Sequence, residues 1–130
     1  MAERPTNARY TRTHEWVIVE GDVATVGITD YAVEHLSDLT FIDLPQVGAV
    51  VKQFEPFGEI ESVKAVEDIN APVSGEVIEV NDALRDQLEL LSQDPYGAGW
   101  MIKVKIADPA ELDKLMNLDD YNSFCEEESG

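Results

Sequence analysis

The chain has 130 residues, of which 44% are hydrophobic, and its 27 acidic and 9 basic residues give a formal net charge of −18. This charge argues against nucleic acid and against an anionic membrane as partners, and no apolar stretch approaches the length of a membrane span. The single cysteine, Cys125, cannot form an internal disulfide, and the first residues lack the apolar core of a signal peptide and the acid-poor character of a transit peptide. We therefore expect a cytoplasmic, monomeric protein with one domain.

The first part of the chain predicts a tail followed by a hairpin. Residues 1–9 are polar, and we expect them to be flexible. Residues 14–20 then alternate apolar and polar side chains and reach a turn at Gly21. This pattern predicts two antiparallel strands, the second over residues 23–28.

Short elements separated by turn residues dominate the middle of the chain. Thr29 is a suitable cap for a helix that ends at about Leu36. Further short strands are predicted at residues 40–43, 50–52 and 76–80. Residues 48–52 and 75–79 share their spacing of a glycine and apolar pairs, which indicates two similar halves on either side of the segment between them.

The last part of the chain predicts one strand and one helix. Residues 100–106 alternate strictly, as a half-buried strand does, and an aspartate followed by Pro109 signals a helix over about 109–117. Many short strands with regular breakers predict a mainly β fold, a flattened barrel or sandwich with a short helix in its N-terminal half and a C-terminal helix. We expect one domain over residues 10–127, with a frayed tail at 128–130.

The segment 58–69 is the most informative part of the sequence. It predicts two strands that meet at a tight turn with Lys64 at its tip, and no other lysine lies between Lys52 and Lys103. Turns favour Gly, Asn, Asp or Pro, and none of these occupies the tip. An exposed lysine among carboxylates stays protonated and is a poor catalyst, so we expect this amine to serve another purpose than catalysis.

Residues 61–66 and 68–77 resemble the lipoylation segment of the glycine cleavage system H protein family. The similarity covers nearly the whole chain and continues in residues 10–11, 14–17, 26–32, 44–48, 79–84 and 94–100. The resemblance implies the quasi-symmetric fold that lipoyl and biotinyl domains share, and lipoate attached covalently to Lys64. A group carrier of this kind places the cofactor and is itself a substrate for other enzymes, so no catalytic residue is expected.

The resemblance also implies the partners of the carrier. A pyridoxal-phosphate-dependent glycine decarboxylase would load an aminomethyl group, and a tetrahydrofolate-dependent aminomethyltransferase would remove it. An FAD-dependent dihydrolipoamide dehydrogenase would then take the electrons. A lipoate ligase or a lipoyl transferase would attach the cofactor.

A cleft for the loaded arm is a further implication of the resemblance. Its expected lining residues are Thr13, Glu15, His35 and Asp68. The carboxylates of Glu15 and Asp68 are expected to face the carried amine, because a buried unpaired charge is costly. The two histidines, His14 and His35, have no cysteine or carboxylate at ligand spacing, so no metal site is predicted.

Other carriers and other roles remain as alternatives at this point. The lipoyl domains of 2-oxoacid dehydrogenases usually carry Asp-Lys-Ala, and biotin carriers Met-Lys-Met, where this chain has Val63-Lys64-Ala65. A carrier of the same fold that distributes lipoate to other acceptors would have the same motifs. An unmodified interaction protein is the remaining alternative.

Overall fold

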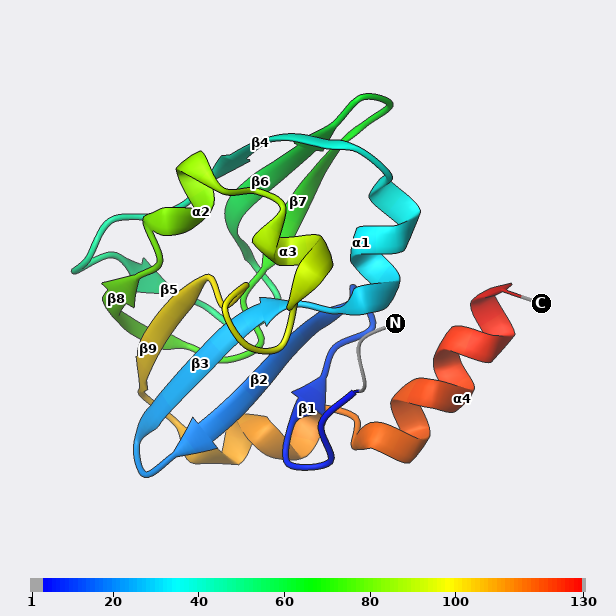
Figure 1. Ribbon diagram of the computed structural model, residues 1–130. Coiled ribbons are helices and arrows are strands. Elements are labelled where there is room, and N and C mark those ends of the chain that lie inside the picture. The colour runs from blue at the N-terminus through cyan, green and yellow to red at the C-terminus, as the bar shows by residue number, and fades with distance from the viewer. Residues whose placement is uncertain (1–3, 130) are drawn as a thin grey trace.

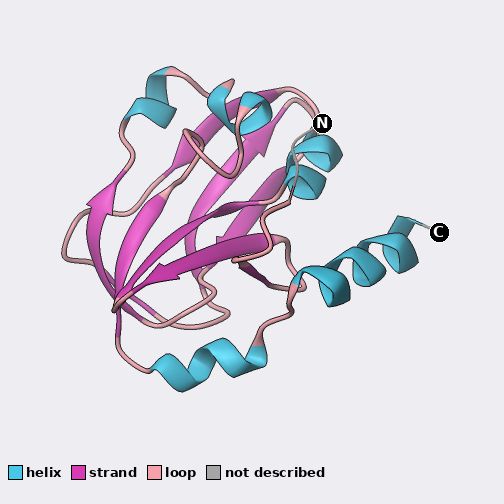
Figure 2. Ribbon diagram, turned by 60° about the horizontal axis from the view of Figure 1, so that its bottom comes forward, coloured by secondary structure: helices cyan, strands magenta, loops and turns pink. Residues whose placement is uncertain are grey.

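Two antiparallel sheets form the body of the protein, and the computed structural model describes residues 4–129 (Figures 1 and 2). The six-stranded sheet contains, in spatial order, β1 (Arg9–Tyr10), β2 (Glu15–Glu20), β3 (Val23–Ile28), β9 (Ile102–Ile106), β8 (Gly75–Val80) and β5 (Val50–Val51). The three-stranded sheet contains β4 (Leu39–Asp43), β6 (Pro56–Ser62) and β7 (Val66–Asn70). The predicted mainly β fold is thus confirmed, as two open sheets rather than a closed barrel.

Helices lie around the sheets. They are α1 (Asp30–Leu36), α2 (Ala83–Asp86), α3 (Leu90–Gln93), the 3-10 helix η1 (Pro109–Lys114) and α4 (Leu118–Ser129). Figure 1 shows α1 beside the three-stranded sheet and α4 extending along the lower right of the molecule. No helix in residues 4–129 is long and apolar enough to cross a membrane.

Two buried clusters hold these elements together. The larger cluster fills the space between the sheets and includes Val26, Val77, Val104, Ile60 and Ile69, all no more than 2% exposed. Each such side chain contributes about 1.5–3 kcal/mol when it leaves water. A second, mostly aromatic cluster joins the six-stranded sheet to α1 and α4. Its fully or largely buried members are Ala8, Tyr10, Trp16, Tyr31, Tyr121 and Cys125.

Local sequence signals account for the first hairpin and the first helix. β2 and β3 pair in register from Glu15 with Ile28 to Glu20 with Val23. Gly21 lies in the turn at φ 63°, a conformation that favours glycine. The hydroxyl of Thr29 accepts a hydrogen bond from the main-chain N–H of Ala32, as predicted for the cap of α1.

The two similar segments on either side of the lysine hairpin are paired with each other. Val50 of β5 lies opposite Glu76 of β8, and Val51 opposite Gly75. The N–H of Gly48 also donates to the carbonyl of Val77 at 2.8 Å. The symmetry suggested by the sequence therefore corresponds to a direct contact between the two segments.

The C-terminal region differs from its prediction. The helix predicted over 109–117 is η1, which ends at Lys114, and the residues after it form a bridge between Met116 and Tyr10. The longer helix α4 follows and was not predicted, although its buried residues Tyr121 and Cys125 lie four positions apart on one face. The tail expected over residues 128–130 also differs, because Glu128 and Ser129 lie in α4, while Gly130 lies outside the described residues.

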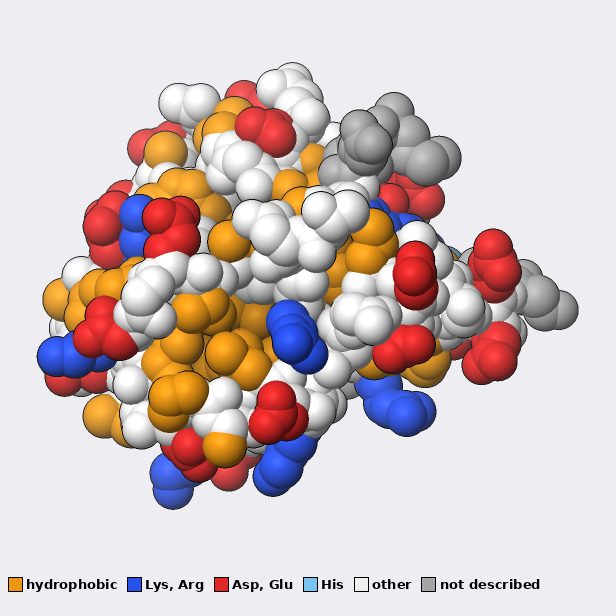
Figure 3. Space-filling view, turned by 90° about the horizontal axis from the view of Figure 1, so that it is seen from below, with side chains coloured by type: hydrophobic (Ala, Val, Ile, Leu, Met, Phe, Trp, Pro, Cys, Tyr) orange, Lys and Arg blue, Asp and Glu red, His pale blue; other side chains and the backbone are white. Residues whose placement is uncertain are grey.

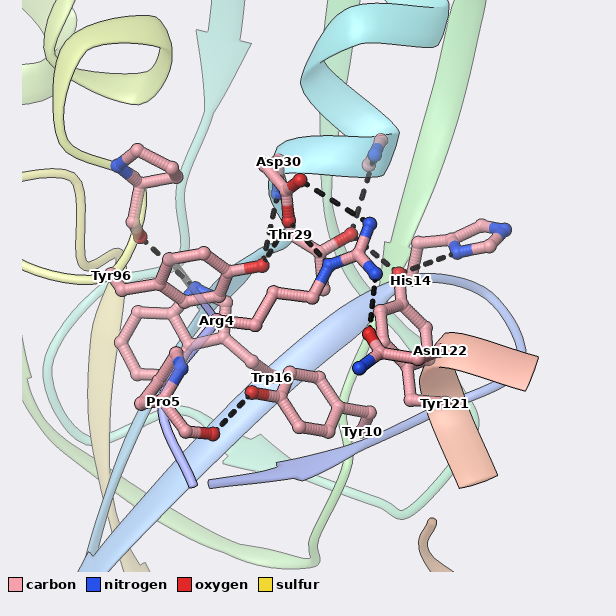
Figure 4. Close-up of polar contacts among 12 residues, drawn as sticks. Arg4, Pro5, Tyr10, His14, Trp16, Thr29, Asp30, Tyr96, Tyr121 and Asn122 are labelled. Carbon is pink, nitrogen blue, oxygen red and sulfur yellow. Dashed lines mark hydrogen bonds and ion pairs between the residues drawn. The ribbon is translucent and has the colours of Figure 1, made fainter. Parts of the chain in front are cut away.

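The N-terminal region is packed more closely than predicted. Arg4 forms an ion pair with Asp30 at 2.8 Å, and its guanidinium donates to Asn122 at 2.6 Å. The hydroxyl of Tyr10 donates to the carbonyl of Pro5 at 2.6 Å. Residues 4–9, predicted as part of a flexible tail, are therefore attached to α1 and α4 (Figure 4), while residues 1–3 of that tail lie outside the described residues.

Candidate functional site

The β6–β7 hairpin presents Lys64 at its tip, as predicted. Figure 1 shows this tip projecting above the rest of the sheet. The turn is closed by a hydrogen bond from the N–H of Ser62 to the carbonyl of Ala65 at 2.8 Å. The hydroxyl of Ser62 also accepts from the N–H groups of Lys64 and Ala65. A serine thus supplies the turn chemistry that the residues of the tip do not.

A second contact fixes the position of the tip. The N–H of Val63 donates to the carbonyl of Asp38, in the loop before β4, at 3.0 Å. The backbone around Lys64 is therefore held from both sides, while the lysine side chain is exposed. This arrangement presents an exposed amine on a fixed backbone, which suits covalent modification by an enzyme that must reach it.

Lys64 and all four predicted cleft residues line one cleft, of about 660 Å³. The predicted lining residues are Thr13 and Glu15 near the start of β2, His35 on α1 and Asp68 on β7. Lys64 is the only lysine among the residues that line the cleft. The structure therefore brings the proposed attachment point and the proposed cleft together.

Glu15 is the most unusual group in the cleft because it is only 1% exposed. Its Oε1 accepts hydrogen bonds from the hydroxyls of Thr11, at 2.6 Å, and Thr13. Its Oε2 accepts the main-chain N–H of Asn70 at 3.1 Å. Burial raises the pKa of Glu15 to about 7, although these hydrogen bonds act in the opposite direction. The carboxylate therefore joins β2 to β7 and titrates near neutral pH.

The free edge of β7 forms one wall of this region. β7 is at the edge of its sheet. Ser62 and Ala65 form a hydrogen-bonded pair that closes the turn, and in an antiparallel pair every second residue bonds to the partner strand. The main-chain N–H and C=O groups of Val66 and Asp68 therefore point away from β6. Asn70 follows the same alternation, and Glu15 accepts its N–H. The cleft thus borders a strand edge whose main-chain N–H and C=O groups can pair with a bound arm.

Asp68 lines the cleft differently from what was expected. Ile69 beside it is 1% exposed and points into the core, so the pleat of the strand directs the Asp68 side chain to the opposite face. Asp68 of β7 lies opposite Glu59 of β6, and Glu59 lies opposite Asp43 of β4. Asp68 therefore offers the cleft its main chain, while its carboxylate belongs to an acidic row on the outer face.

The sequence did not point to the wall that α4 adds to the cleft. His14 and Glu128 both line it, and His14 Nε2 lies 2.9 Å from the Glu128 carboxylate. His14 Nδ1 lies 2.8 Å from the hydroxyl of Tyr121, also on α4 (Figure 4). The imidazole stacks on the ring of Tyr31, which stacks in turn on His35. Burial lowers the pKa of His14, against the opposite effect of Glu128.

The cleft as a whole is lined by two histidines and by four carboxylate residues, Glu15, Glu67, Asp68 and Glu128. Within residues 4–129 no group of three or more histidine, cysteine, aspartate or glutamate side chains is arranged to hold a metal ion. Cys125 is a buried free thiol on α4 whose pKa is raised by burial. It lies among the aromatic residues of the second cluster and does not line the cleft.

A fixed hairpin that presents an exposed lysine beside a cleft, on two antiparallel sheets, is the arrangement expected of a protein that carries a covalently attached group. The family model described as glycine cleavage H-protein matches residues 8–128. The chain belongs to the glycine cleavage H-protein family. It is accordingly a lipoyl carrier of the glycine cleavage system, a role that fits a non-catalytic protein.

Relatives from different lineages support this assignment. A mitochondrial glycine cleavage system H protein of Flaveria pringlei is 52% identical over 120 residues, which are 92% of this chain and 74% of the relative. The H protein of Brevibacillus brevis is 51% identical over 125 residues, 96% of this chain and 99% of the relative.

A solved structure shows the same fold. The crystal structure of a glycine cleavage system H protein from Mycobacterium marinum has a TM-score of 0.86 and 40% sequence identity, and the match covers 92% of this chain and 97% of that one. The interpretation as the lipoyl domain of a 2-oxoacid dehydrogenase is therefore set aside.

Proposed function

We propose that Lys64 is the residue to which lipoate is attached. The observation that carries this proposal is the exposed amine at the tip of a fixed turn, on the only lysine that lines the cleft. After losing a proton, Nζ attacks the carbonyl carbon of an activated lipoyl group. The C–N bond of an amide forms and the bond to the activating group, such as AMP, breaks. The attached group supplies a disulfide that accepts the one-carbon cargo and two electrons.

The cleft is proposed as the place where the loaded arm is held. β7 runs about 13 Å from Val66 to Asn70, at about 3.3 Å per residue, a length that an extended lipoyl-lysine side chain matches. Along this path the arm would meet the free edge of β7 and then Glu15. The arm's own amide would find main-chain partners at that edge.

The residues at the end of the path suit a carried amine. An ammonium group that leaves water requires an anionic or carbonyl partner. Glu15 supplies a carboxylate with one acceptor position beyond the three hydrogen bonds it receives. The hydroxyl of Thr13 and the main-chain carbonyl of Asp68 are further acceptors, and His35 forms part of the opposite wall. Shielding the cargo from water would slow its loss.

The partners of the carrier follow from its place in the glycine cleavage system. We propose that it receives the aminomethyl group from a pyridoxal-phosphate-dependent glycine decarboxylase and passes it to a tetrahydrofolate-dependent aminomethyltransferase. A dihydrolipoamide dehydrogenase containing FAD would reoxidise the arm. The monomeric state, the single domain, the cytoplasmic location and the absence of catalysis by the chain itself stay predictions of the sequence.

Mass spectrometry tests the attachment site directly. The protein is expressed with lipoate and a lipoate ligase, and its intact mass is compared with that of protein made without lipoate. We expect one lipoyl-sized increment, and peptide mapping should locate it at Lys64. An increment located instead at Lys52 or Lys103, or no increment at all, would overturn the assignment.

A further inference from the structure

Three exposed apolar side chains surround the Lys64 turn on the outside of the hairpin. Phe41 is 53% exposed, Val63 68% and Val66 57%. Phe41 and Val66 belong to one row, because Phe41 lies opposite Glu61 and Glu61 lies opposite Val66. Val63 follows in the turn, directly before Lys64. We refer to Phe41, Val63 and Val66 as the tip patch.

Phe41 and Val66 of the tip patch lie on the face of the sheet that points away from the core. Ile42 and Ile60 form the neighbouring row, and each is 2% exposed. Successive residues of a strand point to opposite faces, so Phe41 and Glu61 point outward. A partner seated on the outer face would therefore leave the core side of the sheet undisturbed.

Carboxylates border the tip patch. The next outward-facing row consists of Asp43, Glu59 and Asp68, which lie opposite one another and are all exposed. Between residues 39 and 70 the only cationic side chains are those of Lys52 and Lys64. The end of the molecule away from the hairpin differs, since Lys and Arg side chains are scattered there among acidic and hydrophobic ones (Figure 3).

We propose that the tip patch is the docking surface of the enzyme that acylates Lys64. Its partner surface would be apolar at the centre and would carry Lys or Arg side chains around it, to complement the acidic row. This proposal rests on the proposed attachment of lipoate to Lys64.

The length of the arm selects this enzyme among the possible partners. The acylating enzyme must bring the lysine Nζ itself to its activated lipoyl group, so its entrance must contact the residues beside Lys64. The enzymes that use the finished arm are separated from the tip by the added length of the lipoyl chain. Contact with the tip patch is therefore required for acylation and is not required for later use of the arm.

Matched variants separate the tip patch from exposed apolar residues in general. Phe41→Ser and Val63→Ser remove patch side chains. Phe54→Ser and Val47→Ser are their controls, because Phe54 is 50% exposed and Val47 64% exposed, and both lie outside the hairpin. The rate of lipoylation is measured by intact mass with a lipoate ligase, lipoate and ATP at limiting carrier concentration.

We expect the double variant Phe41→Ser/Val63→Ser to lower kcat/KM for lipoylation at least tenfold, and the control double variant to remain within twofold of wild type. Prolonged incubation with excess ligase should still place one lipoyl group on Lys64. That fully lipoylated variant should support glycine cleavage within twofold of the wild-type rate.

The outcomes distinguish this proposal from the assignment of Lys64. Equal lipoylation rates for patch, control and wild-type proteins would overturn the proposal, as would an equal loss in patch and control variants. A similar loss in glycine cleavage by the fully lipoylated variant would show a general docking surface and also overturn it. Failure of wild-type protein to accept lipoate at Lys64 would instead refute the proposed function.

Discussion

The tip of the lysine hairpin and the base of the cleft are built in opposite ways. At the tip, Ser62 closes the turn within four residues, and one hydrogen bond from Val63 to Asp38 holds it against the sheet. At the base, Glu15 is buried and receives a hydrogen bond from Asn70, 55 residues away in the sequence. The attachment site is therefore separable from the stability of the fold, whereas the end of the cleft is part of that stability.

The most severe effect is expected at the tip, where Lys64→Arg should abolish lipoylation. A guanidinium remains protonated and cannot replace the acylated amine. The free energy of unfolding should change by no more than about 0.5 kcal/mol, because an exposed side chain makes few packing contacts. Intact mass and urea denaturation test the two statements. A variant that unfolds would show that Lys64 contributes to the stability of the fold. A variant that still gains a lipoyl group would show that Lys64 is not the attachment site.

At the base of the cleft, Glu15→Gln should lower the free energy of unfolding by about 1–3 kcal/mol. The carboxylate accepts from two hydroxyls and one N–H, and the amide of a glutamine must turn its own donor toward one of them. The variant should also lose ammonia faster from the loaded arm without the aminomethyltransferase present, while lipoylation stays normal. Urea denaturation and an ammonia assay measure these effects.

Asp68→Asn is the matched control for this variant. Its carboxylate lies on the outer face, so removing the charge should leave both stability and ammonia loss near wild type. Equal rates of ammonia loss from wild type and Glu15→Gln would remove Glu15 from the proposed role. An increase in Asp68→Asn that matches the one in Glu15→Gln would contradict the orientation inferred for Asp68.

The pH dependence of stability also distinguishes Glu15 at the base of the cleft from Lys64 at the tip. The pKa of Glu15 is raised from the ordinary value of 4.5 to about 7 in the folded protein. A group of this kind contributes stability that is complete below about pH 4.5 and is lost as the pH rises through about 7. The loss amounts to about 3 kcal/mol at about 1.4 kcal/mol per pH unit.

Denaturation of wild type and Glu15→Gln across pH 5 to 8 measures this contribution. The stability advantage of wild type should shrink as the pH rises, since glutamine does not titrate. Lys64→Arg serves as the reference at the tip, and its difference from wild type should not vary over the same range. A wild-type advantage that is constant with pH would mean that Glu15 is ionised throughout.

Local signals account for what the sequence could predict. The hairpin of β2 and β3 follows from strict alternation and a glycine turn, and α1 follows from the capping hydroxyl of Thr29. The position of Lys64 at a turn tip also follows from its own segment. Each of these features depends on residues that are close in the sequence.

Long-range contacts account for what it could not predict. His14 and Glu128, which lie 2.9 Å apart on the cleft wall, are 114 residues apart in the chain. Residues 4–9 have a polar composition typical of a tail, and the contacts that hold Arg4 in place are with the distant residues Asp30 and Asn122. The outward direction of the Asp68 carboxylate could be inferred only once the strand register was known, and the spacing of acidic residues does not reveal that register.

A smaller loss of stability is expected for Arg4→Ala, about 1–2 kcal/mol. The guanidinium is half-buried and donates hydrogen bonds to Asp30 and Asn122. In the variant, the Asp30 carboxylate keeps Tyr96 as its remaining side-chain partner among the described residues. Arg9→Ala, at an exposed position nearby, is the control and should change stability by less than about 0.5 kcal/mol. Urea denaturation of both variants measures the difference, and equal values would show that the Arg4 contacts contribute nothing to stability.

The smallest effect is expected from salt, and it should appear at the surface and not at the base of the cleft. The net charge of −18 favours long-range attraction to a basic partner surface, and screening shortens its range to about 8 Å at physiological ionic strength. The KM of a glycine decarboxylase for the lipoylated carrier should therefore rise several-fold between low and physiological salt. The pKa of Glu15 should change little over the same series, because buried groups are screened less than exposed ones. Free lipoamide is uncharged and serves as the control substrate, whose KM should stay constant. If the KM for the carrier is equally constant, electrostatic attraction does not guide docking, and the acidic rows on the outer face contribute to solubility alone.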